Sequence, residues 1–329
     1  MDLSIIIPVY NVEQYIARCL DSIYALPMRE DQFEVLCIDD CSPDGSNAII
    51  EGYQKMYANL RLVHHKENLR QGGARNTGIR EANGEYCIFV DADDSLPQFD
   101  VLACINYMRE NDIELLLGRA NVISANGTVS KWGNSPAVES VIMRGPDIYM
   151  DEYIHKVAFG VVWLGIYKTE LVQRVAPFLE KVQYEDTDWT MRCAYESKRL
   201  QYKPIVLYNY HYNPGTTTTT KSIKSLIEKT EQSLRIYEWA LTTKERHNEV
   251  VFAAEDYGTW NLRGLTSLPS YSYKKRRKFY SLFTREQLGT IARWNGGNYT
   301  KIYVKYPLLS QVALCVMHPI YMVYKSMKE

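Results

Sequence analysis

Three carboxylates follow an apolar run early in the chain. Asp91, Asp93 and Asp94 end a segment that begins at Tyr86, whose aromatic and β-branched residues are typical of a buried strand in an open α/β sheet. Carboxylates this close repel one another, and a hard divalent cation such as Mg²⁺ or Mn²⁺ relieves the repulsion because it prefers carboxylate oxygens. Ligand sites of such sheets lie outside the carboxyl ends of the strands. The residues therefore indicate a metal site, with an acidic turn that caps the next helix as the alternative.

The elements that must position these carboxylates alternate between strands and helices. We predict strands over 3–9, 33–38, 60–64, 86–90 and 113–117, and helices after Asn11, over 46–57, after Asn68 and through 102–107. Asn11 is predicted to cap the first helix, with Gln14 in the capping-box position. This alternation predicts a mostly parallel sheet with helices on both faces. Right-handed crossovers then bring the turns at Asn11, Asp40 and Asp91 to one edge of the sheet, which favours the metal hypothesis.

The turn after the first strand limits what this edge can bind. The Pro8–Asn11 turn lacks the glycine pattern of a dinucleotide-binding turn, and the chain has no Walker A loop. Any phosphates at this edge would therefore need a metal and basic side chains for neutralisation. Arg75 is the candidate for that charge, whereas Arg70 is more typical of an exposed helix start.

Composition indicates a soluble globular protein. The 329 residues are 46% hydrophobic and 23% charged, and the net charge of −1 gives no general attraction to nucleic acid. The seven cysteines include no CxxC pair, so we expect reduced thiols rather than a zinc knuckle or a disulfide framework. The first residues resemble a strand rather than a charged leader, so we expect a cytoplasmic protein.

Five motifs in register resemble those of family 2 glycosyltransferases, an inverting family with the GT-A fold. They are SIIIPVYN (4–11), IDDCSPDGS (38–46), the segment from Asn68 to ARNTG (74–78), VDADD (90–94) and YEDTDW (184–189). The resemblance covers residues 1 to about 215. It implies a mostly parallel central sheet flanked by helices, a nucleotide-sugar donor that is usually a uridine diphosphate sugar, and Mg²⁺ or Mn²⁺ as cofactor.

The resemblance also implies roles for particular residues. Pro8, Val9 and Tyr10 would line the base pocket, and Asp40 would accept a hydrogen bond from uracil. Asp91 would lie near the ribose, Asp93 would hold the metal, and Asp94 would lie beside it. The full set of expected donor-binding residues is Pro8, Val9, Tyr10, Asp40, Arg75, Asp91, Ala92, Asp93 and His211. Arg75 is expected at the base end of the site. Cys41 departs from the family, since many members have Gly there.

The acceptor hydroxyl must lose a proton, which requires a carboxylate on the far side of the sugar. Asp186 is the predicted catalytic base, at the start of a helix whose N-terminus would keep it ionised. The alternative is that Glu185, Asp186 and Asp188 only complement the helix dipole.

Two further side chains are candidates. His211, after a predicted strand over 201–207, could touch the phosphates or the metal, aided by the hydroxyls of 216–220, or be structural. Trp163 could form an acceptor-binding wall by stacking on a sugar, or be a core residue. The other histidines, at 64, 65, 155, 247 and 318, show no ligand spacing.

We expect two domains. Residues 1–220 would form the catalytic domain, with a nucleotide-binding half over 1–118 and an acceptor-binding half over 119–220. Residues 221–329 would form a helical region. Five consecutive basic residues (274–278) and an apolar segment over 306–324, broken by two prolines, suit docking on an anionic membrane at the inner face of the plasma membrane. The alternative is a packed helix beside a solvated charged loop.

These expectations combine into one function. We expect a metal-dependent inverting glycosyltransferase, of hexosyl or N-acetylhexosaminyl type, that extends a saccharide or lipid-linked saccharide in surface polysaccharide synthesis. A phosphotransferase or phosphatase with Asp91 or Asp93 as nucleophile is one alternative, although that nucleophile usually follows the first strand. A catalytically inert sugar-binding module is the other.

Overall fold

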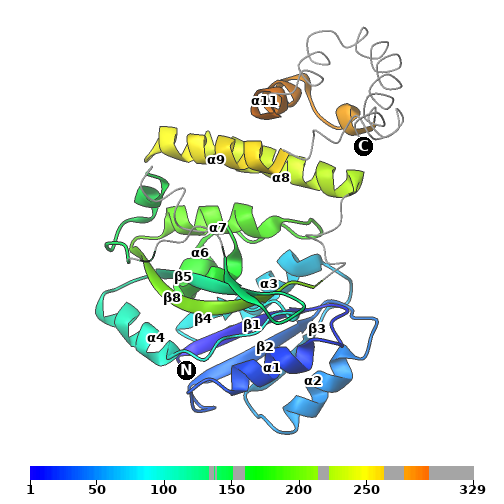
Figure 1. Ribbon diagram of the computed structural model, residues 1–329, viewed down its shortest axis with the longest axis vertical. Helices are drawn as coiled ribbons and strands as arrows, with labels where there is room; N and C mark the ends of the chain where they lie inside the picture. Colours follow the sequence, from blue (N-terminus) through cyan, green and yellow to red (C-terminus); the bar gives the residue numbers. More distant parts are fainter. Residues whose placement is uncertain (133–136, 138, 151–159, 214–221, 263–277, 296–329) are drawn as a thin grey trace. The chain divides into compact units, whose positions relative to one another are not determined.

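The computed structural model describes residues 1–132, 137, 139–150, 160–213, 222–262 and 278–295. The chain forms two compact units, Met1–Thr216 and Thr217–Glu329 (Figure 1). The assignment of a nucleotide-binding and an acceptor-binding half to the first unit stays a prediction.

One sheet of eight strands organises the first unit, in the order β3-β2-β1-β4-β7-β5-β6, with β8 paired to β5. Its strands are β1 (Leu3–Val9), β2 (Phe33–Asp39), β3 (Leu60–His64), β4 (Tyr86–Phe89), β5 (Leu115–Ile123), β6 (Val129–Lys131), β7 (Gly165–Lys168) and β8 (Leu200–His211). The first four strands are parallel neighbours, and β8 runs parallel to β5. The strands β6 and β7 are antiparallel to their neighbours. A mostly parallel sheet was expected, and the structure confirms it.

Helices cover both faces of this sheet. In order they are α1 (Ile16–Tyr24), α2 (Ser46–Gln54), α3 (Arg70–Glu81), α4 (Val101–Glu110), α6 (Thr169–Arg174) and α7 (Glu185–Glu196), with short 3₁₀ turns η1 (Gly145–Tyr149) and η2 (Val162–Leu164). The helices α1 and α2 lie on the opposite side of β1 and β2 from α3 (Figure 1). Every residue of β1, β2 and β4 is therefore buried, which explains their continuous apolar sequences.

The predicted capping box at the first helix is wrong. Asn11 has a left-handed φ of 55°, and α1 begins at Ile16 without a side-chain cap. Contacts with the next loop hold this turn instead, since the Asn11 amide donates to Ser42 Oγ at 2.8 Å and Glu13 Oε2 accepts from the Gly45 amide at 3.0 Å. Bonds between loops outweigh the local capping signal.

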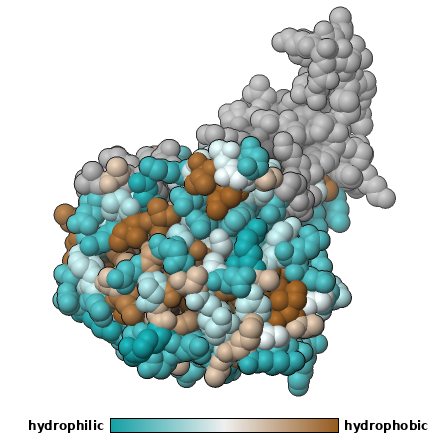
Figure 2. Space-filling model, turned by 60° about the horizontal axis from the view of Figure 1, so that its bottom comes forward, coloured by the Kyte–Doolittle hydropathy of each residue, from teal (hydrophilic) through white to brown (hydrophobic). Residues whose placement is uncertain are grey.

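The described part of the second unit is helical, as expected. Its helices are α8 (Ile223–Ala240), α9 (His247–Asn261) and α11 (Arg285–Asn295). They bury a core that includes Leu234, Phe279 and Ile291. No helix among the described residues is long and apolar enough to cross a membrane. The apolar segment over 306–324 and most of the basic run lie outside the described residues. On the face shown in Figure 2, hydrophobic residues form patches separated by hydrophilic ones.

Candidate active site

The predicted turns meet at the carboxyl edge of the parallel strands. Val9 lies opposite Asp39 in the β1–β2 register, and the Asp40 amide donates to the Val9 carbonyl at 2.9 Å. Arg18, on the helix after the first turn, donates to the Asp93 carbonyl oxygen at 2.5 Å. Hydrogen bonds therefore link the first turn to the other two.

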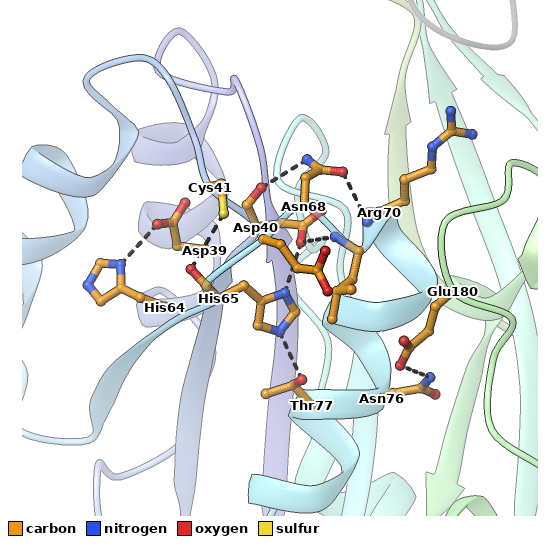
Figure 3. Close-up of polar contacts among 12 residues, drawn as sticks. Asp39, Asp40, Cys41, His64, His65, Asn68, Arg70, Asn76, Thr77 and Glu180 are labelled. Carbon is orange, nitrogen blue, oxygen red and sulfur yellow. Dashed lines mark hydrogen bonds and ion pairs between the residues drawn. The ribbon is translucent and has the colours of Figure 1, made fainter.

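Asp40 is almost fully buried, with one carboxylate oxygen occupied and one open. Its Oδ1 accepts from the Leu69 amide at 2.7 Å and faces His65 Nδ1 at 2.8 Å (Figure 3). Its Oδ2 is buried and has no hydrogen-bond partner among the described residues. A buried carboxylate oxygen without a partner is costly, so Oδ2 is suited to accept a hydrogen bond from a ligand. The preceding residue is not equivalent, because both oxygens of Asp39 are bound by its own loop and His64.

Cys41 stands where many family members have Gly, and its backbone shows why Gly suits the position. Its φ is 63°, in the left-handed region that favours glycine. Its Sγ lies 3.4 Å from the His65 carbonyl oxygen, so it joins the loop to the end of β3.

Arg75 joins the acidic turn to helix α7. Its Nη2 donates to Asp91 Oδ1 at 2.8 Å and its Nη1 to Glu185 Oε1 at 2.5 Å. The guanidinium also lies over the Phe178 ring, 5.7 Å from its centroid. Both terminal nitrogens are therefore bound to protein carboxylates, close to Asp91, which was expected at the ribose. A role for Arg75 at the base of the donor stays a prediction.

The two carboxylates that end the acidic turn differ in their partners. Asp94 is buried and accepts from Tyr208 Oη at 2.8 Å and from the His211 amide at 2.7 Å. Burial and the neighbouring carboxylates raise the pKa of Asp94 to about 8. Asp93 is half-buried, and among the described residues its side chain accepts only a long bond of 3.4 Å from Asn213. Burial and Asp91 raise the pKa of Asp93, so a cation at Asp93 would relieve the cost of its charge.

The acidic turn fits a divalent cation whose other ligands come from elsewhere. No group of three or more His, Cys, Asp or Glu side chains in the described ranges is arranged to hold a metal alone. Mg²⁺ is commonly bound by one or two carboxylates together with substrate phosphates and waters. Asp93, with its open oxygens, is the residue suited to that role, whereas Asp94 is committed to β8.

Asp186 is the second residue of α7, directly after Glu185, and is half-buried. In the described part of the chain no side chain donates a hydrogen bond to this carboxylate. Burial and the nearby carboxylates of Glu185 and Asp91 together raise the pKa of Asp186 to about 7, and Arg75 opposes them. The sequence predicted that the helix N-terminus would keep Asp186 ionised, but burial and two nearby carboxylates raise its pKa in spite of the helix dipole. A carboxylate that titrates near neutrality is suited to act as a general base.

The remaining predicted residues lie around this edge. Pro8 and Val9 are buried at the end of β1, Tyr10 is 52% exposed, and Ala92 is buried. His211 places Nε2 at 2.8 Å from Ser95 Oγ, and burial lowers its pKa to about 4, so the ring is neutral at pH 7. Its contact with phosphate or metal stays a prediction. Residues 216–220 and His155 lie outside the described residues.

Trp163 lies in an aromatic cluster. It stacks on Tyr208 with ring centroids 4.5 Å apart, and Trp132 and Tyr210 pack beside it. Only 6% of Trp163 is exposed. This packing is what the core alternative predicts, and acceptor binding by Trp163 stays a prediction.

Sequence reasoning missed three residues that hold the site together. Glu185 and Tyr208 fix Arg75 and Asp94, and His65 fixes Asp40. The missed signal for His65 was its place: it follows β3 directly, at the same edge of the sheet as the acidic turns. Ligand spacing within the sequence could not find it, because its partners come from other elements.

Known proteins resemble this chain in sequence and in fold. Residues 4–176 match the model of glycosyl transferase family 2. The poly(ribitol-phosphate) beta-glucosyltransferase of Bacillus spizizenii is 31% identical over 215 residues, which make up 64% of this chain and 32% of that relative. The chain spans less than two thirds of the length of this relative and of two uncharacterised glycosyltransferases, EpsJ and YibD.

Two solved structures share the fold. Residues 1–349 of Staphylococcus aureus TarS, in complex with UDP-GlcNAc, give a TM-score of 0.74 at 19% identity, covering 99% of this chain and 92% of that one. The mannosyltransferase PcManGT of Pyrobaculum calidifontis, in complex with GDP-Man and Mn²⁺, gives 0.55 at 18% identity, covering 96% and 86%. These likenesses confirm the predicted fold class.

Proposed function

The chain belongs to glycosyl transferase family 2, and we propose that it is a metal-dependent inverting glycosyltransferase that uses a uridine diphosphate sugar. The family match covers more than half of the 329 residues. The proposed acceptor is a hydroxyl group of a saccharide or lipid-linked saccharide in surface polysaccharide synthesis. The glucosyltransferase relative and TarS, named for poly(ribitol-phosphate), support this acceptor class, and UDP-GlcNAc in TarS supports a uridine diphosphate hexose or N-acetylhexosamine.

One observation carries the proposal. Arg75 bonds at once to Asp91 in the acidic turn and to Glu185 at the start of α7. Asp93 lies two residues after Asp91, and Asp186 directly follows Glu185. Among the described residues, the side chain of Asp93 accepts one long bond and that of Asp186 accepts none from a side chain. This link through Arg75 supports the proposal that a leaving-group holder and a base are held relative to each other, which single displacement requires.

The proposed reaction is one displacement at the anomeric carbon. Asp186 takes the proton of the acceptor hydroxyl as its oxygen bonds to the anomeric carbon from the face opposite the diphosphate. The bond from the anomeric carbon to the phosphate oxygen breaks, its electron pair stays on the nucleoside diphosphate, and the configuration inverts. Asp40 binds the uracil and Asp91 the ribose. A Mg²⁺ or Mn²⁺ held by Asp93 would neutralise the charge of the departing diphosphate.

The first experiment is a panel of nucleotide sugars incubated with Mn²⁺, with and without saccharide acceptors. A glycosyltransferase releases UDP, together with glycoside or, in slow hydrolysis, free sugar. Release of inorganic phosphate would identify a phosphatase, and binding without turnover an inert sugar-binding module. Either result would refute the proposal.

Variants test the two carboxylates separately. Asp93→Asn should lower transfer by roughly 10²- to 10³-fold and remove the Mn²⁺ dependence of UDP binding measured by calorimetry. Asp186→Asn should abolish transfer and leave UDP binding unchanged, because the base does not touch the nucleotide. Asp112→Asn removes an exposed carboxylate (78% of the side chain) and is the control. Near-normal turnover by Asp186→Asn would refute the base assignment.

A further inference from the structure

His65 lies between the candidate nucleobase-binding carboxylate and helix α3. Its Nδ1 is 2.8 Å from Asp40 Oδ1, and its Nε2 is 2.9 Å from Thr77 Oγ1 (Figure 3). The side chain is 8% exposed and that of Asp40 is 3% exposed. Neither nitrogen of the ring is available to a ligand, so His65 acts through its two partners.

The hydrogen-bonded series that runs from Thr77 through His65 to Asp40 allows the positions of its hydrogens to be assigned from the groups that can only accept. A carboxylate oxygen accepts hydrogen bonds, so Nδ1 carries the hydrogen and donates to Oδ1. Thr77 Oγ1 accepts from Arg80 Nη2 at 2.7 Å, which leaves the hydroxyl hydrogen of Thr77 for Nε2. The series of hydrogen bonds from Arg80 through Thr77 to His65 therefore fixes the orientation of the His65 ring. It ends on one oxygen of Asp40.

The result is a carboxylate that presents a single acceptor. The Leu69 amide and His65 both bond to Oδ1, and Oδ2 is left buried without a partner. A buried acceptor discriminates strongly between a ligand group that donates a hydrogen bond and one that cannot. Uracil presents N3–H, a donor, whereas cytosine presents N3 as an acceptor, which a carboxylate oxygen repels.

We propose that His65 is a positioning residue for nucleobase recognition, which holds Asp40 so that Oδ2 selects a base whose ring nitrogen donates a hydrogen bond. This inference rests on the proposed function, because it requires a nucleotide at this edge of the sheet. It assigns to His65 and Thr77 the discrimination between uridine and cytidine nucleotides.

The neighbouring histidine offers a matched control. His64 ends the same strand and also bonds to an aspartate, with Nδ1 at 2.9 Å from Asp39 Oδ2, but its side chain is 53% exposed. Asp39 Oδ2 also accepts from Asn47 at 2.9 Å. Substitution of His64 therefore leaves Asp39 held and does not reach Asp40.

The test compares UDP and CDP binding by titration calorimetry with Mn²⁺ in the full chain. For His65→Leu we expect UDP affinity to fall roughly tenfold and the preference for UDP over CDP to fall by a similar factor, which corresponds to one hydrogen bond to a charged group. His65→Asn should retain most of the preference, since its amide nitrogen can take the place of Nδ1. His64→Asn should leave both affinities unchanged.

A purely structural role for His65 would lower thermal stability without changing the ratio of the two affinities. An unchanged ratio in folded His65→Leu, or a wild-type protein that binds UDP and CDP equally, would overturn the inference. If His65→Leu does not fold, Thr77→Val decides, because it removes only the hydroxyl that orients the ring: a reduced ratio supports the inference and an unchanged ratio overturns it. A wild-type protein that binds no nucleotide refutes the proposed function itself.

Discussion

At the residue scale, identical side chains acquire different chemistry from their partners. Asp39 and Asp94 have their oxygens bound by neighbouring groups and hold loops in place. Asp40 and Asp93 each keep acceptor capacity that the protein does not use. The carboxylates left open are those that a donor and its metal would complete.

The raised pKa of Asp186 predicts the pH dependence of transfer. Only the ionised carboxylate can accept the proton of the acceptor hydroxyl, so kcat at saturating substrates should rise with pH through about 7 and then level. Initial rates between pH 5.5 and 9 measure this profile. A chemistry-limited rate that stays constant from pH 5.5 to 8 would contradict it.

The same pKa predicts how stability changes with pH. An unfolded aspartate titrates near about 3.9, so the folded protein holds the Asp186 proton more tightly and loses stability as pH rises from there through about 7. Asp186→Asn carries no charge. Its melting temperature should therefore match the wild type near pH 4 and exceed it at pH 8, whereas that of Asp112→Asn should follow the wild type throughout. If the melting temperature of Asp186→Asn did not rise relative to that of the wild type between pH 4 and pH 8, the predicted direction of the stability change would be wrong.

At the scale of elements, α3 approaches the sheet closely because it is rich in glycine. A Cβ at Gly78 would lie 2.3 Å from Ile6 Cγ2 in β1, and one at Gly72 would lie 2.2 Å from the Leu179 carbonyl oxygen. Since Arg75 lies on the same helix, this close packing also places the guanidinium between its two carboxylates.

Alanine substitutions test this packing. Gly78→Ala should destabilise the protein by about 1–3 kcal/mol through overpacking. Gly52→Ala, in α2, meets nothing within 4 Å, so it should stabilise by about 0.5–1 kcal/mol through helix propensity. Urea denaturation measures both. If both variants changed the free energy of unfolding by the same amount and in the same direction, the close packing of α3 would not require glycine at position 78.

Breaking the hydrogen bonds of Arg75 to Asp91 and Glu185 should lower the stability of the protein. Arg75→Met leaves Asp91 and Glu185 without their cation, and breaking such a buried pair costs about 3–5 kcal/mol. The double variant Arg75→Met/Glu185→Gln removes one of the two unpaired charges, so it should regain part of the stability but none of the transfer. Arg29→Met breaks an exposed pair with Asp31 and should leave stability almost unchanged, because water screens the pair. A small loss of stability in Arg75→Met would contradict the structural link.

At the scale of the whole molecule, the C-terminal unit carries a prediction of its own. The five basic residues over 274–278 should attract an anionic surface by about 1 kcal/mol each. We therefore expect the full chain to sediment with vesicles that contain phosphatidylserine at low salt, and to be released at high salt. Neutral phosphatidylcholine vesicles and a variant with the five residues changed to glutamine are the controls. No sedimentation at low salt would refute membrane docking.

Much of the fold was predictable from local sequence. A continuous β-branched run such as the one in β1 can remove its side chains from water on both faces only in a buried strand. The strand β3 begins and ends at the residues that its pattern predicted. The start of α1 was not predictable, because Asn11 is held by Ser42, 31 residues away. Local patterns determine which segments are strands and helices, and contacts between segments determine where they end.

The sequence by itself predicted that the turns at Asn11, Asp40 and Asp91 meet at one edge of an α/β sheet, because strand direction and crossover handedness leave few other arrangements. Only the tertiary structure decided which of their oxygens are open, that Arg75 joins Asp91 to Glu185, and that His65 fixes Asp40. The physical reason is the separation along the sequence over which each kind of interaction acts. Hydrophobic period and turn chemistry act over a few residues, whereas the hydrogen bonds and burial that give each carboxylate its chemistry come from segments up to 120 residues apart.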